Sequence, residues 1–299
     1  MSKRSFRRIL AIVPFALSAC GGGVSESPTP SPAALPPISL AQVGDSVMYL
    51  ERTGSFTLIE RPADTLRIRS YHDAVIHVVR TAPDTLEAFY EHLLLRYVTP
   101  SQTRNVPTEA MIGPRFVLHE DDGRIETVRA PELSQEIRQL TDLRRQFDDF
   151  FLRLPRRPLQ VGDVWVDTVA FSARNGDATT DRDAVTRFTV RGDRVVEGIA
   201  ALVVDYQAVL ESNMRTAPTT EGTLASALTG EEEGWFVYAP SRDVMLRRWR
   251  VAILEGELRI EGNHDTRAFP QSFGYESMIE LIPPPPPRAP RPPEPAPES

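Results

Sequence analysis

The chain has 299 residues, of which 41% are hydrophobic and 25% are charged, and its formal net charge at pH 7 is −7. This composition is ordinary for a globular protein, and it excludes both wholesale disorder and a protein built from many membrane-spanning helices. The acidic balance argues against nucleic acid as a partner, because a nucleic-acid-binding surface needs an excess of basic side chains.

Residues 1–19 have the layout of a signal peptide. Four basic side chains and no acidic one come first, at Lys3, Arg4, Arg7 and Arg8. A mostly apolar run over residues 9–19 follows them, as in secretory signals. At a rise of about 1.5 Å per residue this run spans roughly half of a hydrocarbon core. It is therefore too short to be a transmembrane anchor.

The apolar run ends in Leu17-Ser18-Ala19-Cys20, which resembles the lipobox of bacterial lipoproteins. In that family the cysteine is acylated and the peptide before it is removed. The resemblance therefore implies a membrane anchor at Cys20, which is stable when two or three acyl chains are attached. It also implies that Gly21, in place of Asp, permits sorting to the periplasmic face of an outer membrane where the host has one. The alternative is an ordinary secreted protein with an incidental cysteine.

Proline is concentrated in two flanking segments. Five of the 27 prolines lie within residues 28–37, and ten lie within residues 283–297. We therefore expect a lipidated cysteine with a Pro/Ser-rich tether over residues 20–39 and a disordered tail over residues 283–299, flanking a β-rich globular domain over residues 40–282. The tail is either a solvated end or, as an extended polyproline helix, a ligand for another envelope protein.

The first half of the domain, residues 40–130, has mostly strand patterns. Apolar residues occupy every second position in residues 66–71 and 74–79, which is the pattern of half-buried strands. Residues 116–128 place two short strand patterns on either side of an acidic turn, in which Gly123 supplies the positive φ. This segment therefore predicts a hairpin.

Two segments have the residue spacing of an amphipathic helix. Residues 86–98 favour a helix only slightly over a strand, because strands are expected on both sides of them. Residues 131–154 are expected to form one long connecting helix, since Pro131 suits a first helical position and Pro155 ends the pattern. The apolar residues of this second segment are Leu133, Ile137, Leu140, Leu143, Phe147, Phe151 and Leu154.

The second half, residues 156–282, returns to strand patterns. They are expected at residues 164–171, 185–191, 199–211, 235–238 and 244–255. Gln42-Val43-Gly44-Asp45 recurs as Gln160-Val161-Gly162-Asp163, and each copy precedes an apolar strand, which fits a chain of two related halves. The predicted fold class is mainly β (α+β): a curved antiparallel sheet or half-barrel of two β-rich halves, 40–130 and 156–282, with the connecting helix between them.

No motif for catalysis, metal binding or cofactor binding occurs in the chain. The nucleophile elbow, the zinc-protease helix, the dinucleotide loop and the Walker loop are all missing. Cys20 is the only cysteine, which excludes disulfides, cysteine metal sites and cysteine nucleophiles from the domain. We therefore expect no enzyme activity, no metal and no cofactor. A hydrolase with an unrecognised site is the further alternative, and carboxylate pairs beside a histidine in one cleft would support it.

Five aromatic residues on expected strands are candidates for an apolar ligand site, namely Trp165, Tyr206, Trp235, Tyr238 and Trp249. Strand aromatics more often belong to a core, because burying each one stabilises a sheet by about 1.5 to 3 kcal/mol. A single helix across a large curved sheet can nevertheless leave an apolar mouth. That arrangement is similar in architecture, though not in motif, to the half-barrel of lipoprotein-carrier proteins and other lipid-binding envelope proteins.

These patterns lead to one function hypothesis and one rival. The stretch Val161-Gly162-Asp163-Val164-Trp165 and the later Gly198-Ile199-Ala200-Ala201-Leu202 resemble β-rich bacterial envelope lipoproteins of similar size, a resemblance that carries no activity. The hypothesis is a lipid-anchored envelope protein whose domain binds an apolar ligand or a partner protein. The rival is a structural or assembly role that acts through the Pro-rich tail.

Overall fold

The computed structural model describes residues 39–282 with short gaps, at residues 122, 135–136, 138–142, 152, 156, 176–177, 218–221 and 263–264. The chain divides into units Met1–Pro37 and Ile38–Ser299, and all described residues belong to the second unit. The expected signal peptide, Cys20, the tether up to residue 38 and the Pro-rich tail lie outside the described residues. Within the described part, no helix is long and apolar enough to span a membrane.

Twelve strands make up the described domain, which confirms the mainly β prediction. They are β1 (Ser46–Glu60), β2 (Thr65–Ala82), β3 (Thr85–Val98), β4 (Thr103–Val106), β5 (Arg115–Asp121), β6 (Arg124–Arg129), β7 (Val164–Asn175), β8 (Ala178–Val196), β9 (Ile199–Thr216), β10 (Thr223–Ala239), β11 (Val244–Glu261) and β12 (Thr266–Ile282). Three short 3-10 helices accompany them: η1 (Glu109–Met111), η2 (Leu143–Asp148) and η3 (Pro240–Arg242). The strand patterns of both halves and the β5–β6 hairpin are thus present.

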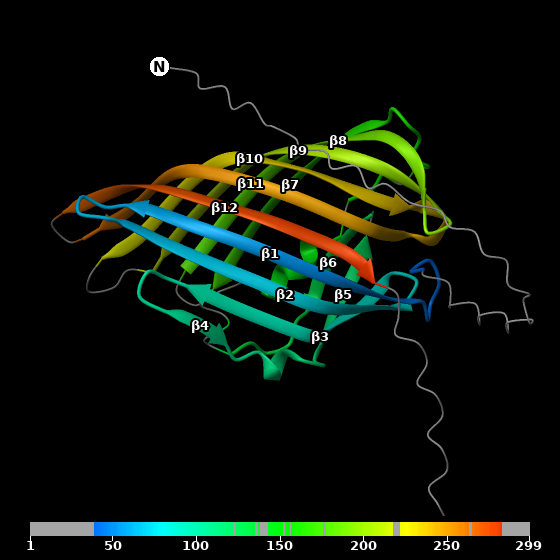
Figure 1. The fold of residues 1–299 in the computed structure, drawn as a ribbon, viewed down its shortest axis with the longest axis horizontal. Helices are drawn as coiled ribbons and strands as arrows, with labels where there is room; N and C mark the ends of the chain where they lie inside the picture. Colours follow the sequence, from blue (N-terminus) through cyan, green and yellow to red (C-terminus); the bar gives the residue numbers. More distant parts are fainter. Residues whose placement is uncertain are drawn as a thin grey trace, which may run out of the picture. The chain divides into compact units, whose positions relative to one another are not determined.

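The strands form one antiparallel sheet in the order β6-β5-β3-β2-β1-β12-β11-β10-β9-β8-β7, with β4 paired to β3 (Figure 1). At its centre β1, the first strand, pairs with β12, the last, from Met48 opposite Ile282 to Ile59 opposite Gln271. This pairing joins the two halves. In the described residues no pairing joins the edge strands β6 and β7, so the sheet is unclosed.

Glycines permit close approach of β10 and β11. A Cβ atom on Gly230 would lie 2.0 Å from the carbonyl oxygen of Ile253, and one on Gly256 would lie 1.9 Å from that of Ala227. No other residue fits at either position without a shift of the backbone. The sheet as a whole is curved strongly enough that residues of β6 and β7, at its opposite edges, line one common cavity.

The described chain enters and leaves the sheet at the same end, which we call the near end. Leu40 donates its backbone N–H to the carbonyl oxygen of Arg242, 3.0 Å away, and Ile282 ends β12 beside Met48 of β1. The hairpins β2–β3, β8–β9 and β10–β11 turn at this end, whereas β1–β2 and β11–β12 turn at the opposite, far end. The main hydrophobic core fills the concave face of the near half.

The prediction of one continuous helix over residues 131–154 is wrong. Residues 131–134 are not helical, and the helical residues described in this segment are Ile137 and η2. Leu140 lies outside the described residues. The helix-like spacing has another cause: the segment crosses the concave face and buries one side against it. Its buried side chains are Leu133, Ile137, Leu143, Phe147 and Phe150.

The helix favoured over residues 86–98 is also wrong, because this segment is β3. Leu86, Ala88 and Tyr90 are buried at every second position, and then the alternation restarts at Leu93 and Leu95. The restart follows from a β-bulge, since Ile76 of β2 pairs with Tyr90 while the preceding Val75 pairs with His92. One extra residue in the bulged strand gives a spacing of three that resembles a helical turn.

The repeated motif forms two equivalent turns. Gln42 donates its backbone N–H to the carboxylate of Asp45 at 2.8 Å, and Gln160 donates to Asp163 at the same distance. Gly44 and Gly162 both have positive φ and both donate to a carbonyl oxygen of the adjacent hairpin strand. The two copies therefore start β1 and β7 in the same way, and the relation between the two halves stays a prediction.

Candidate functional site

A cavity of about 470 Å³ lies on the concave face beyond the segment that joins β6 to β7, and we call it the inner cavity. Inward positions of β1, β2, β3, β8, β11 and β12 line it, and Gln146 of η2 lies on its near side. Its apolar wall contains Ile68, Leu95, Val106 and Phe273. Its polar wall contains Glu51, Thr53, Ser55, Ser70, His72, Arg182, Arg250 and Tyr275. The cavity is thus amphipathic.

Glu51 is a buried carboxylate at the near side of this cavity, with only 1% of its surface exposed. The side-chain nitrogen of Gln146 donates to both of its oxygens, at 2.9 and 2.8 Å. His72 Nε2 lies 4.0 Å from one of these oxygens, beyond hydrogen-bond distance. Thr53 of the same strand also donates to one of these oxygens, at 3.5 Å, so Gln146 is the donor that reaches Glu51 from the segment between β6 and β7.

Three arginines and two carboxylates form a charged layer across the concave face. Arg248 lies 4.0 Å from Glu232 and 3.8 Å from Asp149, measured between nitrogen and oxygen atoms. Arg250 donates to the carboxylate of Asp149, and Arg182 lies 4.0 Å from Glu232. Along β11 this layer separates core residues on the near side from a second apolar cluster on the far side.

The environment of this layer shifts several pKa values, among them those of Asp149 and Tyr275. The side chain of Asp149 is 51% exposed, and although its partial desolvation acts to raise its pKa, the positive charges of Arg250 and Arg248 hold that pKa below its usual value. Burial raises the pKa of Tyr275 to about 12, although Arg250 and Arg182 act in the opposite direction. At neutral pH Asp149 is therefore ionised, and Tyr275 keeps the proton that it donates to Glu232.

The second apolar cluster lies at inward positions of β9, β10 and β11. Its buried members are Ala208, Leu210, Leu228, Ala252 and Leu254. Phe273 and Tyr275 of β12 pack against it and also line the inner cavity. The apolar wall of the inner cavity is therefore continuous with the cluster on the far half of the concave face.

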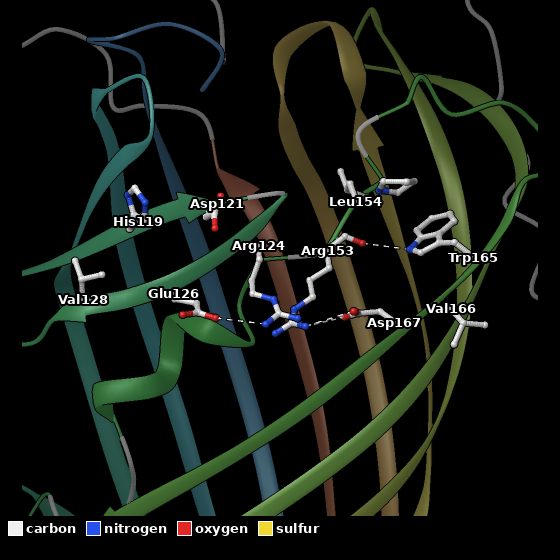
Figure 2. A pocket seen from close by; sticks show the side chains of 11 residues that line it. His119, Asp121, Arg124, Glu126, Val128, Arg153, Leu154, Trp165, Val166 and Asp167 are labelled. Atoms are coloured by element: carbon white, nitrogen blue, oxygen red, sulfur yellow. Dashed lines mark hydrogen bonds and ion pairs between the residues drawn. The ribbon is translucent and has the colours of Figure 1, made fainter.

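A second cavity, of about 570 Å³, lies between the two edges of the sheet, and we call it the edge cavity (Figure 2). Arg153 points into the gap and lies 3.3 Å from the carboxylate of Asp167 of β7, while Arg124 of β6 lies 3.6 Å from Glu126. Charged and apolar side chains both line it, and Val128 and Val166 lie exposed at the two edges.

Two of the five candidate aromatics face the interior and belong to the near-end core. Trp165 stacks on Phe188 with ring centroids 4.8 Å apart, and its Nε1 donates to the carbonyl oxygen of Arg153 at 3.2 Å. Tyr206 contacts the same Phe188 ring at a centroid distance of 5.5 Å. Trp165 also reaches the edge cavity (Figure 2), but Tyr206 does not line either cavity.

The other three candidate aromatics lie elsewhere. Trp235 pairs with Trp249 across β10 and β11. Because Phe236 and Arg248 beside them are buried inward, the alternation turns both tryptophans to the convex face. Tyr238 lies at the near end, where its hydroxyl donates to Asp243 at 2.8 Å. The structure therefore does not bring the five residues together in one site.

The sequence analysis did not predict the residues that line the inner cavity, although the strand pattern marks some of them. Glu51 is in phase with the buried Val47 and Tyr49 along β1. Arg250 is likewise in phase with Leu246, Ala252 and Leu254 along β11. A charged residue at an inward position of a strand marks a buried polar cluster, because burying a charge alone is costly.

The histidines do not gather into a site. His72 faces the inner cavity, whereas His77 faces the other side of the sheet and lies 3.3 Å from Glu91. In the described residues no group of three or more histidine, cysteine or acidic side chains is placed to hold a metal ion. The residues that line the inner cavity include one carboxylate, Glu51, and one histidine, His72. The hydrolase alternative requires a pair of carboxylates beside a histidine, and the lining of this cavity does not contain that pair.

No protein-family model matches the chain, and no curated protein does. A structure entitled "Lipid-protein interactions in lipovitellin" is similar over 81% of this chain and 25% of its own, at 11% identity and a TM-score of 0.46. This chain thus spans about a quarter of the length of that one.

Two structures from Neisseria are similar over most of their own length. Neisserial surface protein A matches over 79% of this chain and 98% of its own, at 7% identity and a TM-score of 0.22. The translocator domain of autotransporter NalP from Neisseria meningitidis matches over 80% of this chain and 88% of its own, at 8% identity and a TM-score of 0.22. All the TM-scores are low, so these likenesses carry no conclusion about what this chain binds.

Proposed function

We propose that the chain is a lipid-anchored envelope protein whose β-rich domain binds a ligand with an apolar part in the inner cavity. One observation supports this proposal above all others. The segment that joins β6 to β7 covers the concave face only as far as η2, and beyond it Ile68, Leu95 and Phe273 line a cavity of about 470 Å³. Cavities of this size, roughly 300 to 1,000 Å³, commonly hold small ligands.

A small ligand suits this site better than a partner protein. A stable protein interface needs roughly 800 Å² of surface on each partner, which is usually flat or convex. The inner cavity is recessed between inward side chains of β1, β2, β3 and β12. The charged layer and the segment with Gln146 close its near side.

The anchor part of the proposal rests on Cys20 and its sequence context. The described chain begins at Ser39 and ends at Ile282, both at the near end. A tether running from Cys20 to Ser39 therefore joins the domain at the end opposite to the far half of the concave face. We place the protein on the periplasmic face of an outer membrane, where the host has one.

Lipid extraction and mass spectrometry of the full chain, purified from a bacterial host, test the proposal. We expect a bound lipid or other apolar molecule to co-purify with the wild-type protein, because an apolar wall of this kind seldom stays empty. Thr57→Trp fills the inner cavity and should abolish retention. Thr229→Trp, an exposed position on the convex face, is the matched control and should retain the ligand. A folded wild-type protein without any bound molecule would contradict the proposal.

A further inference from the structure

We propose that the ligand of the inner cavity is an amphiphile with an anionic head group, carboxylate or phosphate, and that Arg182 binds this head group. The inference rests on the proposed function, because it names the class of ligand for the same cavity. It is carried by three observations: the uncommitted donors of Arg182, the charge balance around it, and the apolar wall beside it.

Arg182 uses only part of its hydrogen-bonding capacity. Its Nη2 donates to the hydroxyl of Tyr275 at 3.2 Å and lies 4.0 Å from the carboxylate of Glu232. No other contact of its guanidinium occurs within the described residues, so the Nε and Nη1 donors are uncommitted. The side chain is 26% exposed and lines the inner cavity. The uncommitted N–H groups of this guanidinium can each donate a charge-assisted hydrogen bond to an oxygen of a carboxylate or phosphate.

The charges around Arg182 favour an anion. Three arginines of the charged layer, Arg182, Arg248 and Arg250, face two carboxylates, Asp149 and Glu232. Glu232 is shared, since it lies 4.0 Å from both Arg182 and Arg248 and also accepts from Tyr275. Within this layer one positive charge is left over, while Glu51, the carboxylate at the near side of the same cavity, is bound by Gln146.

The remaining surface of the cavity suits the tail of an amphiphile. Ile68, Leu95 and Phe273 form its apolar wall. Three of the hydroxyls that line it are already paired, since Ser55 and Ser70 share a hydrogen bond of 2.6 Å and Thr53 donates to Ser277 at 2.9 Å. Hydroxyls that are satisfied by one another do not require a polar ligand above them. The cavity therefore offers an anion-binding end and an apolar side.

Binding of two matched ligands decides this inference. We would titrate the full chain carrying Cys20→Ser, so that no acyl anchor is present, with palmitate and with hexadecanol, which has the same chain length and no charge. Acetate and inorganic phosphate test the head group alone. We expect palmitate to bind at least tenfold more tightly than hexadecanol, and acetate and phosphate to bind far more weakly than palmitate, because the site needs both parts of the ligand.

Substitutions at two arginines of β8 test whether Arg182 causes the preference for palmitate over hexadecanol. Arg182→Gln should reduce the affinity for palmitate to that for hexadecanol, and Arg182→Lys, which keeps the charge but not the planar fork, should keep part of the difference. Arg187→Gln is the control, because Arg187 lies exposed on the opposite face of β8. Its palmitate affinity should equal that of the parent chain.

The possible failures point to different conclusions. Equal binding of palmitate and hexadecanol by the parent chain overturns the head-group inference and leaves the proposed function standing. Binding of neither compound, in a folded protein, overturns the proposed function itself. If phosphate or acetate binds as tightly as palmitate, the inference that the ligand is an amphiphile is wrong. If Arg182→Gln still prefers palmitate to hexadecanol as strongly as the parent chain does, the inferred role of Arg182 is wrong. The comparison of the two ligands on the parent chain stays decisive even where a variant fails to fold.

Discussion

Gln146 donates from one side-chain nitrogen to both carboxylate oxygens of Glu51, at 2.9 and 2.8 Å, and so ties the segment between β6 and β7 to the centre of the sheet. The two residues are 95 positions apart in the chain. Glu51 is buried, with 1% of its surface exposed. This contact therefore satisfies a buried charge and at the same time fixes the near side of the inner cavity.

Gln146→Leu should lower the free energy of unfolding by about 3 kcal/mol, because it leaves a buried carboxylate without its main donor. Urea denaturation measures the loss. Gln207→Leu, an exposed glutamine on β9, is the control and should change stability by less than about 0.5 kcal/mol. A Gln146→Leu protein as stable as the control would show that the contact contributes nothing.

Asp149 should make the protein sensitive to acid. Its pKa is lowered in the folded state relative to the unfolded chain, so it contributes stability above the unfolded value of about 3.9, and this contribution is lost as the pH falls below that value. Asp149→Asn should be less stable than wild type at neutral pH and should lose less stability between about pH 4 and pH 2. Thermal unfolding over this pH range measures both effects. Parallel curves for the two proteins would contradict the expectation.

Gly256→Ala should destabilise the sheet by about 2 kcal/mol or more, because the added Cβ atom would lie 1.9 Å from the carbonyl oxygen of Ala227. Gly192→Ala is the control, since no heavy atom lies within 4 Å of a Cβ at that position and its φ is not positive. Urea denaturation of the two variants should separate them clearly. Equal stabilities would mean that the close approach of β10 and β11 does not depend on glycine.

Cys20→Ser removes the only thiol that can be acylated. We expect this variant to leave the membrane fraction, because no other segment of the sequence is expected to hold the chain there. Fractionation after a high-salt wash measures its distribution, with wild type as the reference. A variant that still pellets with membranes would refute the lipid anchor.

Deletion of residues 283–299 separates ligand binding from a scaffold role of the tail. The deletion begins after Ile282, the last residue of β12, so the sheet keeps all its pairings. We expect the unfolding midpoint and ligand retention to equal those of the full chain. If a protein partner is captured from envelope extracts by the full chain and lost on deletion, while no small ligand is retained by either, the tail is the functional element.

The sequence by itself determined the local conformation of most of the chain. Alternation with period two identified both β-rich halves, because a strand half-buried against a core must alternate its side chains. Gln42-Val43-Gly44-Asp45 and its second copy form the same turn, since their hydrogen bonds lie within four residues and one neighbouring strand. Local patterns failed where a β-bulge near Tyr90 and the one-sided burial of residues 131–154 imitated helical spacing.

Only the tertiary structure decided where the two cavities lie and which residues line them. Arg182 and Tyr275 meet because β8 and β12 curve toward each other across the concave face. The sequence contains no record of this curvature, since it is the sum of small twists over many strand pairs. For the same reason the aromatics singled out by type, such as Trp235 and Trp249, fall on the convex face, while the charged residues at inward strand positions line the inner cavity.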